Sequence, residues 1–178
     1  MSDQEDHFIE SARREPWNKG RLIGQKRPLR PKDVWAIRVR LQIGGLARDL
    51  ALFNLAVDSK LRACDLVALR ISDVEAGGRI RERATIVQKK TGRPVQFEIT
   101  EPTRAALRDW LATLGHRPGG YLFPSRFRRN PHLSTRQYAR ILRGWVTSIG
   151  LEPSVPSLTL PTCSRGFHRG RPAHGAHE

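Results

Sequence analysis

The first clear pattern of apolar positions lies between residues 31 and 43, and it fits two structures. Every second residue from Trp35 to Ile43 is large and apolar, as in a strand that buries one face. However, Pro31 and Asp33 are typical of the first turn of a helix, and the run is long for a strand. We therefore favour a helix here, broken by Gly44-Gly45. The mostly apolar stretch 46–57 then predicts a buried helix.

A short helix is predicted over residues 61–70, with Asp58 or Ser59 as its N-cap. Gly77-Gly78 marks a turn. Apolar residues alternate imperfectly with polar ones at 80–86 and cleanly at 95–99, and the basic stretch 89–93 joins the two runs. This stretch contains Gly92, as a hairpin turn requires. We expect an antiparallel β-hairpin with a pair of lysines near its tip.

Two more helices are predicted in the second half of the chain. Thr100 can cap the first, which tolerates Pro102 in its first turn and carries leucines at 107, 111 and 114. The second begins with the capping-box pair Ser134 and Gln137 and ends at Gly150. Its apolar positions, from Tyr138 to residue 149, recur at steps of three and one.

The charge narrows the class of partner. The 178 residues include 26 arginines and 6 lysines against 17 acids, so the net charge is +15. Such an excess favours a nucleic-acid partner, because neutralising phosphates releases counterions. An arginine-rich composition can also reflect a GC-rich genome, and on charge alone RNA stays as open as DNA. No apolar run approaches the roughly 18 residues of a membrane span, which predicts a protein without a membrane partner.

The start of the chain and its cysteines indicate a cytoplasmic protein. The first ten residues are mostly polar with four acids, unlike a secretory signal. Cys64 and Cys163 cannot form a disulfide framework, and no Cys/His cluster suggests structural zinc. Residues 1–30 continue with a basic stretch, and we expect a flexible arm there that either contacts DNA or is simply solvated.

The most informative stretch, residues 61–74, reads Leu-Arg-x-x-Asp-Leu-x-x-Leu-Arg-x-x-Asp-Val. Asp65 follows Arg62 at a spacing that lets a carboxylate hold a guanidinium in place, although a surface ion pair has the same spacing. The pattern resembles the first conserved box of the tyrosine site-specific recombinases, or phage integrases. The lysine hairpin and the order of the later elements agree over roughly residues 30–156.

The resemblance implies a fold, a reaction and residue roles. The fold would be α+β: a mainly helical catalytic domain with a small antiparallel sheet. The reaction would be DNA strand breakage and rejoining through a phosphotyrosyl link, with no metal or other cofactor. Arg62 would be the first catalytic arginine, Asp65 its supporting acid, and Lys90 the catalytic lysine, with Lys89 as the alternative. The partners would be double-stranded DNA and, in the assembled form, other recombinase protomers, and the protein would associate with the nucleoid.

The chain departs from this family after residue 156. The family continues with a His-x-Leu-Arg box and a nucleophilic tyrosine, and neither is present. Tyr138 lies on an apolar helical face, Tyr121 also precedes the place of the missing box, and His168 with Arg171 is a chance match. We therefore divide the chain into a basic arm (1–30), a partial catalytic domain (31–156) and an aberrant, disordered tail (157–178) read in the wrong frame.

Three functions follow, in order of preference. The first is a recombinase domain that is incomplete at its C-terminus and inactive as written. The second is a non-catalytic DNA-binding protein that occupies recombination sites. The third, favoured by arginine content alone, is a basic RNA-binding protein.

Overall fold

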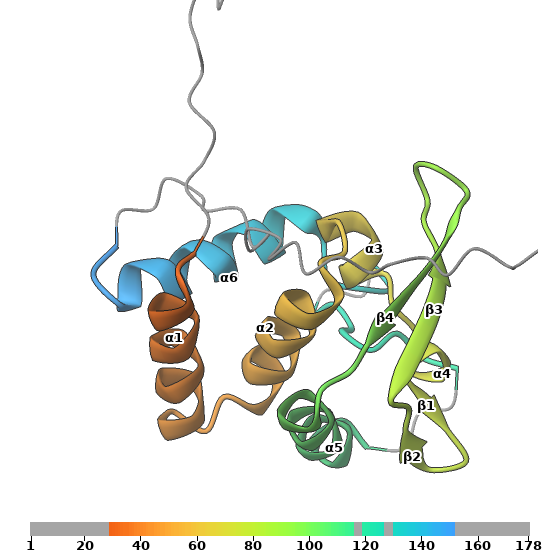
Figure 1. Ribbon diagram of the computed structural model, residues 1–178, viewed down its shortest axis with the longest axis horizontal. Coiled ribbons are helices and arrows are strands. Elements are labelled where there is room, and N and C mark those ends of the chain that lie inside the picture. Colours follow the sequence, from red (N-terminus) through yellow and green to blue (C-terminus); the bar gives the residue numbers. More distant parts are fainter. Residues whose placement is uncertain (1–28, 116–118, 127–129, 152–178) are drawn as a thin grey trace, which may run out of the picture.

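A computed structural model describes residues 29–115, 119–126 and 130–151 (Figure 1). The described helices are α1 (Pro31–Ile43), α2 (Ala47–Ser59), α3 (Ala63–Val67), α4 (Ile71–Val74), α5 (Glu101–Leu114) and α6 (Thr135–Ser148). The strands are β1 (Glu75–Ala76), β2 (Arg79–Ile80), β3 (Arg83–Val87) and β4 (Pro94–Glu98). The arrangement is a mainly helical α+β fold, as the sequence predicts, and its described part contains two small antiparallel sheets.

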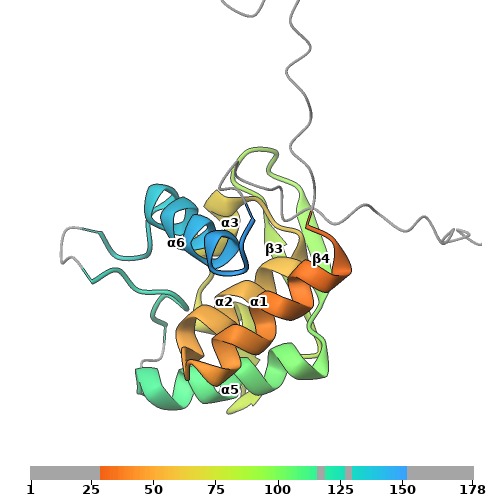
Figure 2. The same cartoon turned by 90° about the vertical axis from the view of Figure 1, so that its left-hand side faces the viewer.

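The core forms around α2, which is buried without interruption from residue 51 to residue 57. Figure 2 shows α1 in front of α2, with α5 below them and α6 above. Phe53 of α2 meets Trp145 of α6 edge to face, with ring centroids 5.4 Å apart. The Trp145 indole N–H also donates to Asp49 at the start of α2 over 3.3 Å. These contacts hold α6 across the helices that precede it.

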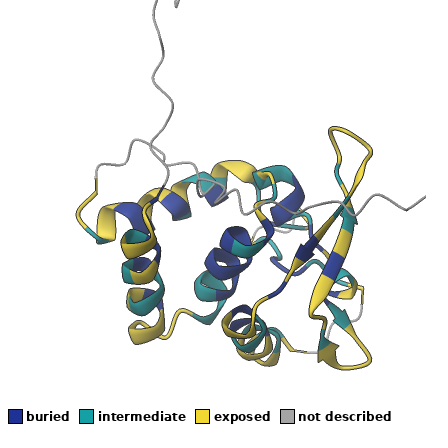
Figure 3. Ribbon diagram, in the orientation of Figure 1, coloured by how far each residue is buried: buried dark blue, intermediate teal, exposed yellow. Residues whose placement is uncertain are grey.

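α1 is a helix, so the alternating pattern at 35–43 does not mark a strand. Two residues advance a helix by about 200°, so alternate apolar residues occupy opposite faces. Ile37 and Leu41 face the core, with 1% and 4% of their surfaces exposed. Trp35 and Ile43 face outward and are 66% and 84% exposed (Figure 3 shows the exposed positions). The helix therefore has two apolar faces, and the described residues bury one of them while they leave Trp35 and Ile43 on the other exposed.

The predicted hairpin is confirmed. β3 and β4 pair in antiparallel register, with Ala84 opposite Phe97 and Thr85 opposite Gln96. Ala84 and Phe97 are buried, while Thr85 and Gln96 on the other face are exposed. The turn at Gly77-Gly78 is also present, where positive φ angles of 57° and 76° suit glycine. It joins the short pair β1–β2, which the sequence did not predict.

The helix expected at 61–70 is shorter than predicted, and its cap is different. α3 covers only Ala63–Val67, and a separate turn of helix, α4, follows it. Asp58 and Ser59 belong to the end of α2, so neither caps α3. Lys60 then takes up a left-handed conformation (φ 52°), which ends α2 and turns the chain toward Arg62.

The two later helices are confirmed. α5 starts after Thr100 with Pro102 in its first turn, but the Thr100 hydroxyl donates to Asp58 instead of capping its own helix. α6 begins with the predicted capping box, in which Ser134 accepts from the Gln137 N–H over 3.2 Å. In the described ranges no helix is long and apolar enough to span a membrane. Residues 1–28 of the predicted arm, and the tail from residue 157 on, lie outside the described residues. Leu29, at the end of the predicted arm, is buried in the core, and Arg30 is the N-cap of α1, so these two residues belong to the domain, which starts two residues earlier than predicted.

Candidate active site

The predicted arginine stands at the start of α3. Arg62 has an extended backbone (φ −65°, ψ 149°), and its carbonyl accepts from the N–H groups of Asp65 and Leu66 at 3.0 and 2.9 Å. Leu66 and Leu69, both 2% exposed or less, anchor this short segment in the core as the sequence predicted. The Arg62 side chain is exposed. A rigid turn therefore presents a guanidinium to solvent.

Asp65 joins α3 to the hairpin. Its carboxylate is 4% exposed, and Oδ1 accepts the main-chain N–H of Lys89 over 3.0 Å. The second oxygen, Oδ2, is buried and has no hydrogen-bond partner among the described residues. The expected Arg62–Asp65 pair is not formed in the described part of the chain, because Asp65 points from the first turn of α3 toward the hairpin. The acid thus positions the hairpin turn.

The hairpin tip has its own hydrogen bonds. The Gln88 N–H donates to the Arg93 carbonyl at 3.0 Å, and the Gly92 N–H donates to the Gln88 carbonyl at 2.9 Å. Gly92 has φ 63°, a conformation that a side chain would strain. The Thr91 hydroxyl donates to the Gln88 side chain over 2.9 Å. Lys89 and Lys90 are both exposed on this closed turn.

A hollow of about 350 Å³ lies between α3, α4 and β3. Polar groups of Asp65, Arg70, Asp73, Thr85 and Lys89 contribute to its walls, together with apolar side chains at 68, 69, 86 and 87. Neither Arg62 nor Lys90 lines it. The structure thus brings Asp65 and Lys89 together. Arg62, three residues before Asp65, and Lys90, the residue after Lys89, lie outside the hollow.

Two polar contacts near this site were missed by the sequence analysis. Arg70 lies over the ring of Tyr121, with its guanidinium carbon 5.1 Å from the ring centroid. Its main-chain N–H donates to Asp73 over 2.7 Å, which caps α4. The repeated Arg-x-x-Asp spacing at 70–73 was the available signal for this cap.

Asp58 links the segment before Arg62 to the end of the hairpin. Its Oδ2 accepts from the Thr100 N–H at 3.0 Å, the Thr100 hydroxyl at 2.8 Å and the Thr103 hydroxyl at 2.6 Å. Asp58 therefore caps a helix, but it caps α5, which starts more than forty residues later. The sequence carried no sign of this distant partner.

The two tyrosines occupy different surroundings. Tyr138 is 6% exposed, and burial raises the pKa of its hydroxyl well above the ordinary value of 10.0. It packs in the core, as its place on the apolar face of α6 predicted. Tyr121 is half-buried, and its ring lies 4.8 Å from that of His132. The chance match His168–Arg171 and the second cysteine, Cys163, lie outside the described residues.

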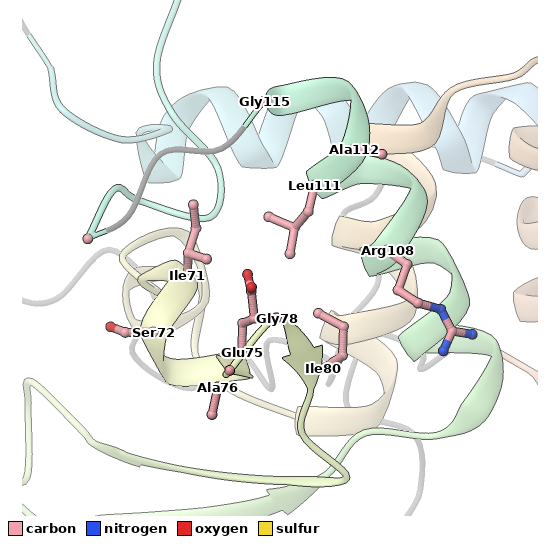
Figure 4. Close-up of a pocket in the computed structure, with 12 residues that line it drawn as sticks. Ile71, Ser72, Glu75, Ala76, Gly78, Ile80, Arg108, Leu111, Ala112 and Gly115 are labelled. Atoms are coloured by element: carbon pink, nitrogen blue, oxygen red, sulfur yellow. The ribbon is translucent and has the colours of Figure 1, made fainter.

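A larger hollow lies away from these residues, between the β1–β2 turn and α5. Its volume is about 560 Å³, and Figure 4 shows Ile71, Ile80 and Leu111 around it, with the carboxylate of Glu75 between them. None of the predicted site residues lines it. The described residues contain no cluster of His, Cys, Asp and Glu that could hold a metal ion.

Comparison with known proteins agrees with this arrangement. A search of the curated proteins finds no match. Among solved structures, the XerA recombinase matches with a TM-score of 0.57 at 19% sequence identity, over 73% of this chain and 47% of the XerA chain. The chain thus spans about half the length of that structure, and the likeness shows a shared fold. The family model described as "Phage integrase family" matches residues 29–169. The chain therefore belongs to the phage integrase family, whose tyrosine recombinase catalytic domain it resembles in fold.

Proposed function

We propose that this chain is a DNA-binding domain of a site-specific recombinase, in which Arg62 and Lys90 contact one DNA phosphate and Asp65 positions them. The observation that carries the proposal is the bond from the Lys89 N–H to Asp65. It ties the helix that follows Arg62 to the turn that carries Lys90. Two cations that are 28 residues apart in sequence are thereby held on neighbouring segments.

The roles follow from the chemistry of phosphodiester cleavage. Negative charge builds on the non-bridging oxygens in the transition state, and a fixed guanidinium stabilises it more than it stabilises the ground state. Arg62 can supply that donor because its backbone is held by α3. An ammonium near the leaving 5′ oxygen can give it a proton, which is the role we assign to Lys90. Lys89 remains the alternative.

A basic helix face beside α3 supports binding to duplex DNA. α6 packs against α3 and carries exposed arginines at 136, 140 and 143. Steps of four and three residues place these three side chains on one face of the helix. A guanidinium can donate two hydrogen bonds to one phosphate, so a row of arginines can contact successive phosphates of a DNA backbone. We assign it to phosphate contacts that carry no sequence preference.

We further propose that the chain is catalytically incomplete as written and that residues 157–178 are read in the wrong frame. The His-x-Leu-Arg box of the family is expected at the position where the composition changes, near residue 157. Without the tyrosine nucleophile, the covalent intermediate cannot form. Translating the gene in its other two frames past codon 157 tests this. If neither frame encodes a His-x-Leu-Arg box followed by a tyrosine, the frameshift proposal fails.

Binding to duplex DNA is the direct test of the proposed function. We expect labelled duplex to compete better than structured RNA at matched salt, and affinity to fall steeply as salt rises. RNA that competes equally well would favour the RNA-binding alternative. A nicked suicide duplex tests the proposal that the chain is catalytically incomplete: a covalent protein–DNA adduct would show an active enzyme and overturn it. Absence of the adduct fits both the incomplete recombinase and a protein that only occupies recombination sites.

Arg62→Ala tests the assignment of the arginine. Where the parent protein cleaves DNA, the Arg62→Ala variant should cleave it about 10²–10³-fold more slowly. The variant should keep most of its affinity for duplex DNA, because other basic residues share the phosphate contacts. Arg79→Ala is the matched control, since Arg79 is also an exposed arginine and stands in β2, away from α3 and the hairpin tip. A large loss of binding with intact cleavage would refute the assignment. We also propose a cytoplasmic, nucleoid-associated location and assembly with other protomers.

A further inference from the structure

The outer face of α1 is apolar, and two of its three side chains are left exposed by the described residues. We define this outer face as Trp35, Val39 and Ile43, which recur every four residues and therefore lie within about 80° of one another on the helix. Trp35 is 66% exposed and Ile43 is 84% exposed. Val39 lies between them and is half-buried. Single exposed apolar side chains are ordinary, but two on one helix face with a third apolar residue between them form an apolar row that suits a binding surface.

Cations stand at both ends of the outer face. Lys32 and Arg40 are exposed and lie on the same side of α1 as the apolar row. The acid of α1, Asp33, is turned to the helix start, where its carboxylate accepts the Arg30 N–H over 3.1 Å. Arg38 is held on the inner side by Asn54 at 2.8 Å. The outer face is therefore complementary to a segment that has apolar side chains flanked by acids.

A second copy of this chain is a poor occupant. A symmetric pairing through the outer face would bring the cations of both copies together, between two molecules that each carry a net charge of +15. The described residues offer no other neighbour for this face. An acidic, apolar segment is the better complement.

The first ten residues of the chain have this chemistry. They contain no lysine or arginine, four acids, and the adjacent apolar pair Phe8-Ile9. We propose that residues 2–10 dock on the outer face of α1, with Phe8 and Ile9 against the apolar row and the acids near Lys32 and Arg40. These ten residues lie outside the described ranges, and the proposal is independent of the proposed function.

Chain length permits this contact. Residues 11–28 connect the acidic segment to the start of the described structure just before α1. Eighteen residues can span up to roughly 60 Å, whereas a helix of α1's length is only about 20 Å long. The tether also raises the local concentration of the segment to about the millimolar range. A contact of modest intrinsic affinity would therefore be well populated.

Photo-crosslinking of the full chain tests the proposal. A benzoylphenylalanine at position 35 should crosslink, within the same molecule, to the peptide that contains residues 1–13. Trp35 is exposed, so the replacement should leave folding intact. Val87, an apolar residue of the hairpin that is also 66% exposed, is the matched control position. A link from position 35 to a second copy or to another segment, or a yield no higher than that from position 87, would overturn the proposal.

A charge swap tests the electrostatic part separately. Lys32→Glu combined with Arg40→Glu should lower the crosslink yield roughly three- to tenfold, as expected for losing two surface ion pairs. Adding Glu5→Lys and Asp6→Lys to that variant should restore the yield. Circular dichroism checks that each variant is folded. An unchanged yield after the first swap, or no rescue by the second, would show that charge does not direct this contact.

Discussion

Replacing Asp65 with alanine removes the acceptor of the Lys89 main-chain N–H, and the effect should be local. The bond is 3.0 Å long, and its acceptor is a buried carboxylate. Hydrogen bonds to charged groups contribute about 1.5–3 kcal/mol. The substitution also removes a buried oxygen that has no partner among the described residues, which offsets part of the loss in global stability. The free energy of opening the hairpin turn should therefore fall more than the free energy of unfolding.

Amide hydrogen exchange measures this opening residue by residue. A loss of about 1.5–3 kcal/mol corresponds to an increase of roughly 10- to 100-fold in the exchange rate of the Lys89 amide. Asp65→Asn keeps an acceptor oxygen but loses its charge, so its Lys89 amide should exchange faster than in the wild type and more slowly than in Asp65→Ala. Asp73→Ala is the matched control, because it removes a similar main-chain bond in the same hollow, but to Arg70 and not to Lys89. An unchanged Lys89 exchange rate in Asp65→Ala would refute the claim that this acid fixes the turn.

Three further predictions concern the core and the hydrogen bonds that Asp58 makes to α5. Asp58→Ala loses three hydrogen bonds to the start of α5 and should lower the free energy of unfolding by about 2–4 kcal/mol in urea titrations. An unchanged midpoint of the titration would contradict a stabilising role of these bonds. Phe53→Ala should cost about 3–5 kcal/mol by the same measurement, since the ring is fully buried against α6, and a loss below about 1 kcal/mol would contradict that packing. Burial raises the pKa of Tyr138, so the unfolded state releases this proton first, and stability should fall as the pH rises above about 10. Tyr138→Phe should weaken that dependence more than Tyr121→Phe does, and equal effects of the two variants would refute it.

Local signals in the sequence predicted the elements that depend on local contacts. The capping box at Ser134 and Gln137 marked the start of α6, because both partners lie within one helical turn. The glycine in the lysine-rich turn marked the hairpin, because Gly92 needs a positive φ angle. The pattern in α1 was ambiguous for a physical reason: a helix with two apolar faces shows the same alternation as a strand.

Long-range polar contacts could not be predicted from spacing. Asp65 was expected to hold Arg62, three residues away, but its partner is the main chain of Lys89, 24 residues away. Asp58 was expected to cap the next helix, but its partners lie 42 and 45 residues away. Only the folded chain brings these groups together, so the candidate residues were identifiable while the bonds that position them were not.

The anchor of the hairpin turn is a peptide N–H, and this has a consequence for substitution. Any amino acid except proline supplies that group, so the bond to Asp65 places no requirement on the side chain at position 89. In a saturation library at codon 89, nearly every residue should keep the hairpin turn folded, and proline should not. On the proposed assignment, a library at position 90 should accept lysine and few other residues. Comparing the two libraries therefore tests which of Lys89 and Lys90 has the proposed role.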